Sequence, residues 1–347
     1  ITVNPTPTLL DPSDQVVCNN TLTTGVTFSG NGTSYSWIND NSSIGLLGTG
    51  TGNIQAFNAI NSSSNPLIAS INIIPNFTGG TVSCPGVGQS FTITINPTPN
   101  LSPLTSEIIC DGGTTTPITF SGNGTSFTWS NNTPTINLAA SGSGDIPSFT
   151  IDNPSSSNVL VATITGTPNY FNAGFNCQGV PQEMTFTINP TPIITPIANL
   201  TYCNSTNTQL INFAGTGTSY NWTNSDITTG LTASGSGLSI GSFNASNQSN
   251  QLVSSTIVAT PEFTANGITC PGNATSFSIT VNPTPSVAAI TDQTVCNNTS
   301  TNAVIFTGSV SNTVFNWINS ISTIGLSNSG SGDIQAFTAL NNGSTPI

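Results

Sequence analysis

The sequence predicts an all-β protein, built as a rod of tandem antiparallel β-sandwich repeats of about 93 residues. Three observations predict it. A proline-containing motif recurs at almost constant spacing, apolar and polar residues alternate between its copies, and no segment shows the helical period of 3.6 residues. Together these features indicate sandwich domains in series rather than helical repeats.

The tetrapeptide Asn-Pro-Thr-Pro marks the repeat. It begins at Asn4, Asn96, Asn189 and Asn282, so its steps are 92, 93 and 93 residues. Cysteine and aromatic residues recur at nearly the same spacing, which lets the copies be compared position by position. The predicted domains are the end of a preceding repeat at residues 1–3, repeat 1 at 4–95, repeat 2 at 96–188, repeat 3 at 189–281 and an incomplete repeat 4 at 282–347.

The strands of a repeat follow from a two-residue period. Phe91, Ile93 and Ile95 alternate with threonines, as expected of a strand that has one face in a core. Segments rich in Gly, Asn and Pro interrupt such strands about every ten residues, which is typical of the turns in a sandwich. Each repeat is therefore expected to fold as one antiparallel sandwich.

The predicted core contains aromatic residues that recur once per repeat. One tryptophan per repeat, on an alternating strand, matches the central core position of a sandwich; a sugar-stacking surface is the alternative. The predicted core residues are Trp37, Trp129, Trp222, Trp317, Phe28, Phe120, Phe213 and Phe306.

The paired prolines are predicted to form stiff linkers. Proline fixes φ and cannot continue a strand ladder, so each motif ends one repeat and holds the next at a set angle. A stiff rod is the expected result. The linker residues are Pro5, Pro7, Pro97, Pro99, Pro190, Pro192, Pro283 and Pro285.

The charge composition excludes several classes of partner. The chain has no lysine, arginine or histidine among its 347 residues, and its formal charge is −12. Nucleic-acid binding needs cations against phosphate and is therefore excluded, as is a basic patch for anionic lipids. No apolar run reaches the ~18 residues of a membrane helix, so membrane insertion is not expected. We expect no cofactor.

Segments throughout the repeat carry a resemblance to a known family. They resemble the PKD-like, immunoglobulin-like repeats of giant secreted proteins of the Bacteroidota. The resemblance implies an immunoglobulin-like sandwich, type IX secretion, and a role in gliding, adhesion or grappling-hook appendages, with a signal peptide and a sorting domain elsewhere in the protein. The matching segments in repeat 1 are NPTP from Asn4, VCN from Val17, TFSGNGTSYSW from Thr27, GTGNIQAF from Gly50, CPG from Cys84 and FTITINP from Phe91.

The seven cysteines are expected to form disulfides, which imply an oxidising, extracellular setting. They are 66 or 67 residues apart within a repeat and 26 apart between repeats, with no C-x-x-C for a metal site. Pairing within repeats is favoured, because a bridge across a sandwich is a common staple. Pairing between repeats, such as Cys84 with Cys110, is the alternative. The favoured pairs are Cys18 with Cys84, Cys110 with Cys177, and Cys203 with Cys270, which leaves Cys296 for a cysteine near position 363.

Motifs that could carry chemistry are weak. Gly237–Gly241 matches G-x-S-x-G, but the chain has no histidine to activate Ser239. The repeats place their acids at different positions, which favours scattered surface acids over a catalytic pair, with an opportunistic calcium site as the alternative. Thr92 and Thr94 are interpreted as ordinary strand residues rather than an ice-binding array.

The sequence therefore predicts a structural protein and not an enzyme. We expect the shaft of an extracellular, cell-surface filament or giant adhesin that provides reach, stiffness and durability. The alternative is an adhesin module whose repeats bind glycans or cells. The expected partners are identical chains in a homo-oligomeric bundle, and surface glycans or other cells through other regions of the protein.

Overall fold

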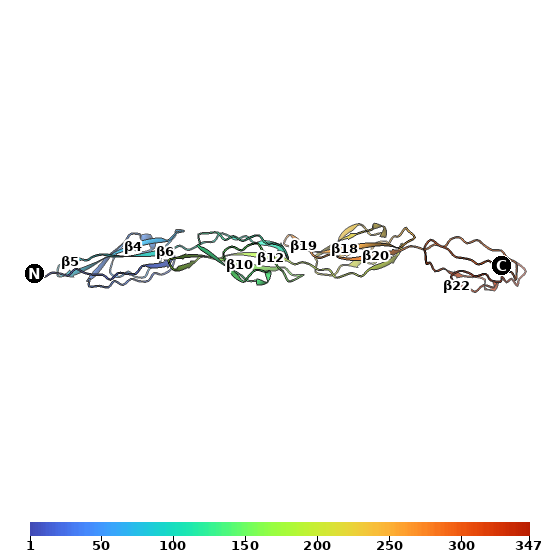
Figure 1. Ribbon diagram of the computed structural model, residues 1–347, viewed down its shortest axis with the longest axis horizontal. Helices are drawn as coiled ribbons and strands as arrows, with labels where there is room; N and C mark the ends of the chain where they lie inside the picture. The colour runs from blue at the N-terminus through green and yellow to red at the C-terminus, as the bar shows by residue number, and fades with distance from the viewer. The chain divides into compact units, whose positions relative to one another are not determined.

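The computed structural model describes residues 1–347, and it confirms the predicted fold class (Figure 1). The chain is almost entirely strands and loops and forms two compact units, residues 1–190 with repeats 1 and 2 and residues 191–347 with repeats 3 and 4. No helix is long and apolar enough to span a membrane. The helical residues lie in four 3-10 turns: η1 (Ser42–Ile44), η2 (Pro134–Ile136), η3 (Ile227–Thr229) and η4 (Ser322–Ile324).

Each complete repeat has one main sheet. In repeat 1 the strand order is β1-β6-β4-β2-β3, with β5 paired to the end of the long strand β4. The first and last strands of the repeat, β1 and β6, run parallel, which differs from the predicted all-antiparallel sandwich. The strands are β1 (Gln15–Cys18), β2 (Ser34–Asn39), β3 (Thr49–Thr51), β4 (Leu67–Gly79), β5 (Val82–Pro85) and β6 (Gln89–Asn96).

Repeats 2 and 3 reproduce this order. Repeat 2 contains β7 (Glu107–Cys110), β8 (Ser126–Asn131), β9 (Ser141–Ser143), β10 (Leu160–Asn172), β11 (Phe175–Gln178) and β12 (Gln182–Asn189). Repeat 3 contains β13 (Leu200–Cys203), β14 (Ile211–Asn212), β15 (Ser219–Asn224), β16 (Ser234–Gly237), β17 (Ser239–Ile240), β18 (Val253–Ala265), β19 (Ile268–Pro271) and β20 (Thr275–Asn282). Repeat 4 contains β21 (Asn316–Ile318) and β22 (Ser329–Ser331).

A second layer of extended chain packs against each main sheet. In repeat 1 an isolated bridge joins Val26 to Ile54, and in repeat 3 the matching segments form the short pair β14–β17. The alternating residues of the long strands fill the space between the layers, as the two-residue period predicts: Ile71 and Ile73 of β4 and Ile93 of β6 are fully buried.

The recurring tryptophans pack against a glycine on the neighbouring strand. Trp37 faces Gly50 in the β2–β3 register, and a Cβ added to Gly50 would lie 2.0 Å from its ring. The glycine is therefore needed for the indole to lie flat on the sheet. The same pairs are Trp129 with Gly142, Trp222 with Gly235 and Trp317 with Gly330.

The burial of the predicted core residues depends on how many strands their repeat contains. Five are buried: Trp37, Trp222, Phe28, Phe120 and Phe213. Trp129 is half-buried against the core of repeat 2. Phe306 and Trp317 are also only half-buried, because repeat 4 has no long strands to cover them.

Buried asparagines hold the loops of each repeat. The amide of Asn153 donates to the carbonyls of Asn158 (3.0 Å) and Ile188 (2.9 Å), and its own oxygen accepts from the Ser155 backbone N–H (3.0 Å). Asn61 and Asn247 make the equivalent bonds in repeats 1 and 3. Because a buried backbone carbonyl without a donor is costly, these amides take the place of a strand partner.

Candidate functional site at the junction of repeats 1 and 2

A disulfide within residues 1–190 involves a β-hairpin of repeat 2. Strands β10 and β11 pair antiparallel, and the turn residues Ala173 and Gly174 have φ values of +48° and +83°. Two successive residues with positive φ are typical of a tight hairpin whose twist matches its strands. Cys177 lies on β11 opposite Tyr170 of β10, so the hairpin presents a cysteine close to its tip.

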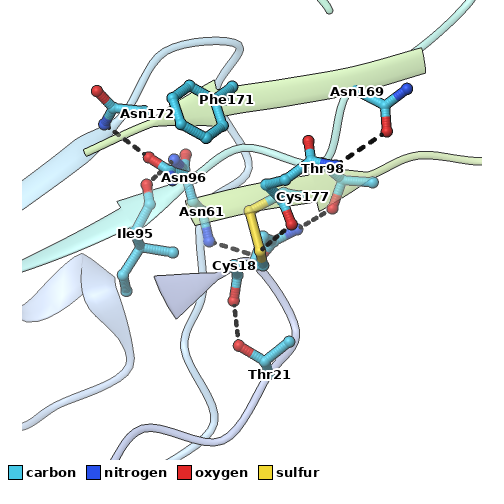
Figure 2. Close-up of a disulfide and its surroundings, with 12 residues drawn as sticks. Cys18, Thr21, Asn61, Ile95, Asn96, Thr98, Asn169, Phe171, Asn172 and Cys177 are labelled. Carbon is cyan, nitrogen blue, oxygen red and sulfur yellow. Dashed lines mark hydrogen bonds between the residues drawn. A yellow bond between two sulfur atoms is a disulfide. The ribbon is translucent and has the colours of Figure 1, made fainter. Parts of the chain in front are cut away.

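This hairpin is bonded to the preceding repeat (Figure 2). Cys177 forms a disulfide with Cys18, with a Cα–Cα distance of 5.6 Å and a sequence separation of 159 residues. Cys18 is the last residue of β1, where it lies in register with Asn96 of β6, and its carbonyl accepts a hydrogen bond from the Thr21 hydroxyl (2.6 Å). The bridge therefore joins two ordered elements of different repeats.

An amide contact beside the bridge ties the hairpin to the linker. Asn172, the last residue of β10, donates through its side chain to the Asn96 side-chain oxygen at 2.8 Å (Figure 2). Asn96 begins the linker between repeats 1 and 2 and is fully buried, and Pro97 and Pro99 are buried as well. The linker is thus enclosed by packed structure, which limits bending at the junction.

A glycine packs against three of the four linkers. A Cβ on Gly179 would lie 1.8 Å from the Pro99 carbonyl oxygen, so only glycine allows this approach. The glycine follows two residues after the second cysteine of the repeat, and the equivalent glycines approach the equivalent prolines. These pairs are Gly86 with Pro7 (2.1 Å) and Gly272 with Pro192 (1.8 Å).

We expect Gly179→Ala to loosen this linker. The added methyl must displace backbone, so the free energy of unfolding should fall by about 1 to 3 kcal/mol, measured by urea denaturation. Gly241→Ala is the matched control, because nothing lies within 4 Å of its added Cβ. Equal stability of the two variants would show that the Gly179 contact does not hold the linker.

The predicted disulfide pairs are wrong. Cys18 bonds Cys177 rather than Cys84, which also excludes Cys110 with Cys177. Cys203 is a free thiol whereas Cys270 is disulfide-bonded, so these two are not a pair. The alternative of Cys84 with Cys110 fails too, because Cys84 is free. Cys296 is also free, and nothing tests its predicted pairing with a cysteine near position 363.

Distance along the sheet explains the error. Cys18 lies beside the β6 residues that pair with Leu67 at the start of β4, whereas Cys84 pairs with Phe77 near its end. A strand rises about 3.3 Å per residue, so the two cysteines of a repeat lie roughly 30 Å apart. A disulfide needs Cα atoms within about 7 Å. The second cysteine therefore reaches the neighbouring repeat instead of its own.

The acidic residues act as hydrogen-bond acceptors that neutral residues replace in other repeats. Asp145 accepts the backbone N–H of the core residue Phe120 (2.9 Å), and Asn53 accepts that of Phe28 in repeat 1 (3.0 Å). Asp40 accepts from Ser70, as Asn132 and Ser225 do from Thr163 and Thr256. Because the same bond forms without a charge, these acids have a structural role.

Asp14 gives a pH test of this role. The Thr92 backbone N–H donates to it (2.6 Å), and this bond lowers the pKa of the exposed Asp14 carboxyl below its ordinary value. The Thr228 hydroxyl and N–H lower the pKa of Asp226 in the same way. A lowered pKa stabilises the fold above the unfolded value of about 3.9, and that contribution is lost as pH falls further through the folded pKa.

We therefore expect Tm to change little between pH 7 and pH 5 and to fall below about pH 4. Calorimetry across this range checks the expectation. Asp14→Asn should keep the bond, because Asn199 makes it to Ser278 in repeat 3 (2.8 Å), and should flatten the decline. A marked loss of Tm already at pH 5 would contradict these assignments.

The remaining candidate motifs do not assemble a reactive site. Ser239 lies in β17, in register with Asn212. No group of three or more Cys, Asp or Glu residues is placed to hold a metal ion. The buried Trp37 and Trp222 have no face open for stacking on a sugar.

Comparisons with known proteins name no family. No family model matches the chain, and no curated protein does. Among solved structures, mouse cadherin-23 EC22-24 is 12% identical, with a TM-score of 0.37 over 81% of this chain and 100% of that one. Mouse protocadherin-24 EC1-3 is 12% identical (TM-score 0.35; 82% and 98%), and the titin I9-I11 tandem 11% (0.25; 80% and 100%). Similarity this low carries no argument about the function of this chain.

Proposed function

We propose that the chain is a segment of the structural shaft of an extracellular, cell-surface filament or giant adhesin. The observation that carries the proposal is the Cys18–Cys177 bridge between repeats 1 and 2. An isolated domain needs its staple inside its own core, whereas this staple secures a junction. A junction that is bonded and packed serves a protein that must keep successive domains aligned under load.

The bridge also changes the path that tension takes. A force applied to the two ends of the chain passes through the disulfide, so residues between Cys18 and Cys177 are protected from full extension. Unfolding of repeat 1 or repeat 2 then lengthens the shaft less than the unfolding of a free 93-residue domain would. Disulfides persist outside the cytoplasm, which supports the extracellular assignment.

The finer parts of the proposal rest on the sequence. The resemblance to repeats of Bacteroidota surface proteins supports type IX secretion and attachment, motility or prey capture as the setting. Structural acids and the lack of histidine support a non-enzymatic role. A polar surface with few charges supports side-by-side association of identical chains. A formal charge of −12 over 347 residues causes only weak electrostatic repulsion between neighbouring chains.

Small-angle X-ray scattering tests the shaft. A compact chain of this length has a radius of gyration of about 20 Å. If each repeat spans the length of its 13-residue strand, the rod should give about 45 to 50 Å. A value near 20 Å would contradict the proposal.

A binding screen separates the shaft from an adhesin module. The chain, applied to a glycan array and to whole cells, should show no saturable binding if its role is structural. Saturable binding that is lost on changing one exposed side chain would overturn the shaft in favour of a binding module.

A further inference from the structure

Repeat 4 has an open groove, lined by both polar and apolar side chains, where the other repeats have a core. Its volume is about 880 Å³, and its lining includes Val304, Ile324, Leu326, Ile334, Phe337 and Leu340. In repeat 1 the counterpart of Ile324 is Ile44, which is fully buried in the cluster that contains the inner residues of β4 and β6. The groove is thus the place where a long strand and a last strand pack.

In repeat 3 the counterpart of Cys18 is Cys203, a free thiol at the end of a folded strand. Cys203 ends β13, lies in register with Asn282, and accepts the Thr206 hydroxyl at its carbonyl (2.6 Å), as Cys18 accepts that of Thr21 (2.6 Å). The Asn204 side chain donates to the Thr284 hydroxyl (3.0 Å), which matches Asn19 and Thr98 in repeat 1 (2.9 Å). The receiving half is therefore already folded.

The same surface is covered in one repeat and uncovered in the other. Asn96 is fully buried, and Pro97 and Pro99 are buried under the hairpin of repeat 2. Their counterparts are more open: Asn282 and Pro283 are half-buried, and Pro285 is exposed. Cys203 is likewise exposed.

In repeat 2 a single segment covers both the core of its own repeat and the cysteine at the end of the preceding repeat's first strand. Between Leu160 and Asn189, strands β10 and β12 complete the sheet of repeat 2 over its core, and the intervening hairpin carries Cys177 to repeat 1. The equivalent segment of repeat 3, Val253–Asn282, has the same strand–turn–strand pattern and an inner face with Ile257 and Ile279.

We propose that the groove of repeat 4 and the Cys203 thiol of repeat 3 form one docking site. Its occupant is a strand–turn–strand segment of this repeat type, the counterpart of Val253–Asn282, supplied by the same polypeptide. The segment completes the sheet of repeat 4 by strand addition. Its cysteine lies about 160 residues after Cys203, the spacing that joins Cys18 to Cys177. A disulfide oxidant such as oxidised glutathione takes two electrons from this thiol and the Cys203 thiol, both thiols lose their protons, and the two sulfur atoms bond.

A grafted chain tests the proposal. Residues 254–282 are joined after Ile347 of the full chain, which is oxidised in a glutathione buffer and mapped by mass spectrometry. The grafted cysteine should bond Cys203, which then stops reacting with iodoacetamide, while Cys84 and Cys296 keep reacting. A grafted cysteine that bonds Cys296, or stays free beside a reactive Cys203, would overturn the proposal.

A peptide in trans guards against misfolding of the graft. A synthetic peptide of residues 253–282 is offered to the unaltered chain in the same buffer. It should be captured at Cys203 in preference to Cys84 and Cys296. The control peptide carries Ile257→Asp and Ile279→Asp, keeps its cysteine, and should lose that preference because it cannot fill the groove. Equal capture of both peptides, or equal capture at all three thiols, would show thiol exposure alone and refute the site. The shaft proposal would still stand, because it rests on the Cys18–Cys177 bridge.

Discussion

Complete reduction should lengthen the fully stretched segment between Cys18 and Cys177 by about 540 Å. The Cys18–Cys177 bridge closes a loop of 159 residues, and an extended chain spans roughly 3.3 to 3.6 Å per residue. While the bridge is intact, this loop cannot be pulled out, and the segment stays shorter by the length of the loop. Optical tweezers that hold the chain directly outside Cys18 and directly outside Cys177, with and without dithiothreitol, measure the difference. The increase is the largest change that we expect from any single treatment, because it alters how force runs through the protein.

Peptide mapping supplies the control for this experiment. Trypsin has no site in the chain, so the oxidised protein is digested with a protease that cuts at acidic residues. One linked pair of peptides should contain Cys18 and Cys177. Linked pairs within repeats would instead enclose loops of 66 or 67 residues, and finding them would contradict the junction. Cys84→Ser, which removes a free thiol, should leave the extension unchanged.

Asn153→Asp should destabilise repeat 2 by about 3 to 5 kcal/mol at pH 7. The Asn153 amide donates to two carbonyl oxygens, those of Asn158 and Ile188, in a site that is only 4% exposed. A carboxylate cannot donate to them, and it would be buried as an unpaired charge in a chain without a single cationic side chain. Hydrogen exchange of peptides from repeat 2 measures the loss within that repeat.

Asn158→Asp is the matched control. It makes the same chemical change five residues further along, on an exposed side chain, and leaves the Asn158 backbone carbonyl in place as an acceptor. Its effect should stay within about 0.5 kcal/mol, as for ordinary surface substitutions. If both variants lose the same stability, the charge itself matters and the buried amide does not.

Local patterns explain why the fold could be predicted. Alternation of apolar and polar residues identifies a strand wherever it lies, and a period of 92 or 93 residues identifies repeated domains. The parallel pairing of β1 with β6 could not be predicted, because β1 has only four residues and its partner lies at the other end of the repeat.

The roles of the polar residues were largely missed, although the sequence contains a signal for them. Asn61, Asn153 and Asn247 occupy equivalent positions in three repeats, as do the glycines that follow the second cysteines. A chain so rich in Asn and Gly makes such recurrences hard to separate from composition. Their function became evident only from the carbonyls that they reach, such as those of Ile95 and Pro99.

The sequence by itself determined the all-β class, the repeat length and most of the buried aromatic residues, because these depend on contacts within a strand or between neighbouring strands. The cysteine partners were decided only by the tertiary structure. A 13-residue strand carries the second cysteine of a repeat far from the first, and the linker sets which residues of the preceding repeat it meets. Disulfide pairing depends on distance in space, and the spacing of cysteines along a chain does not contain that distance.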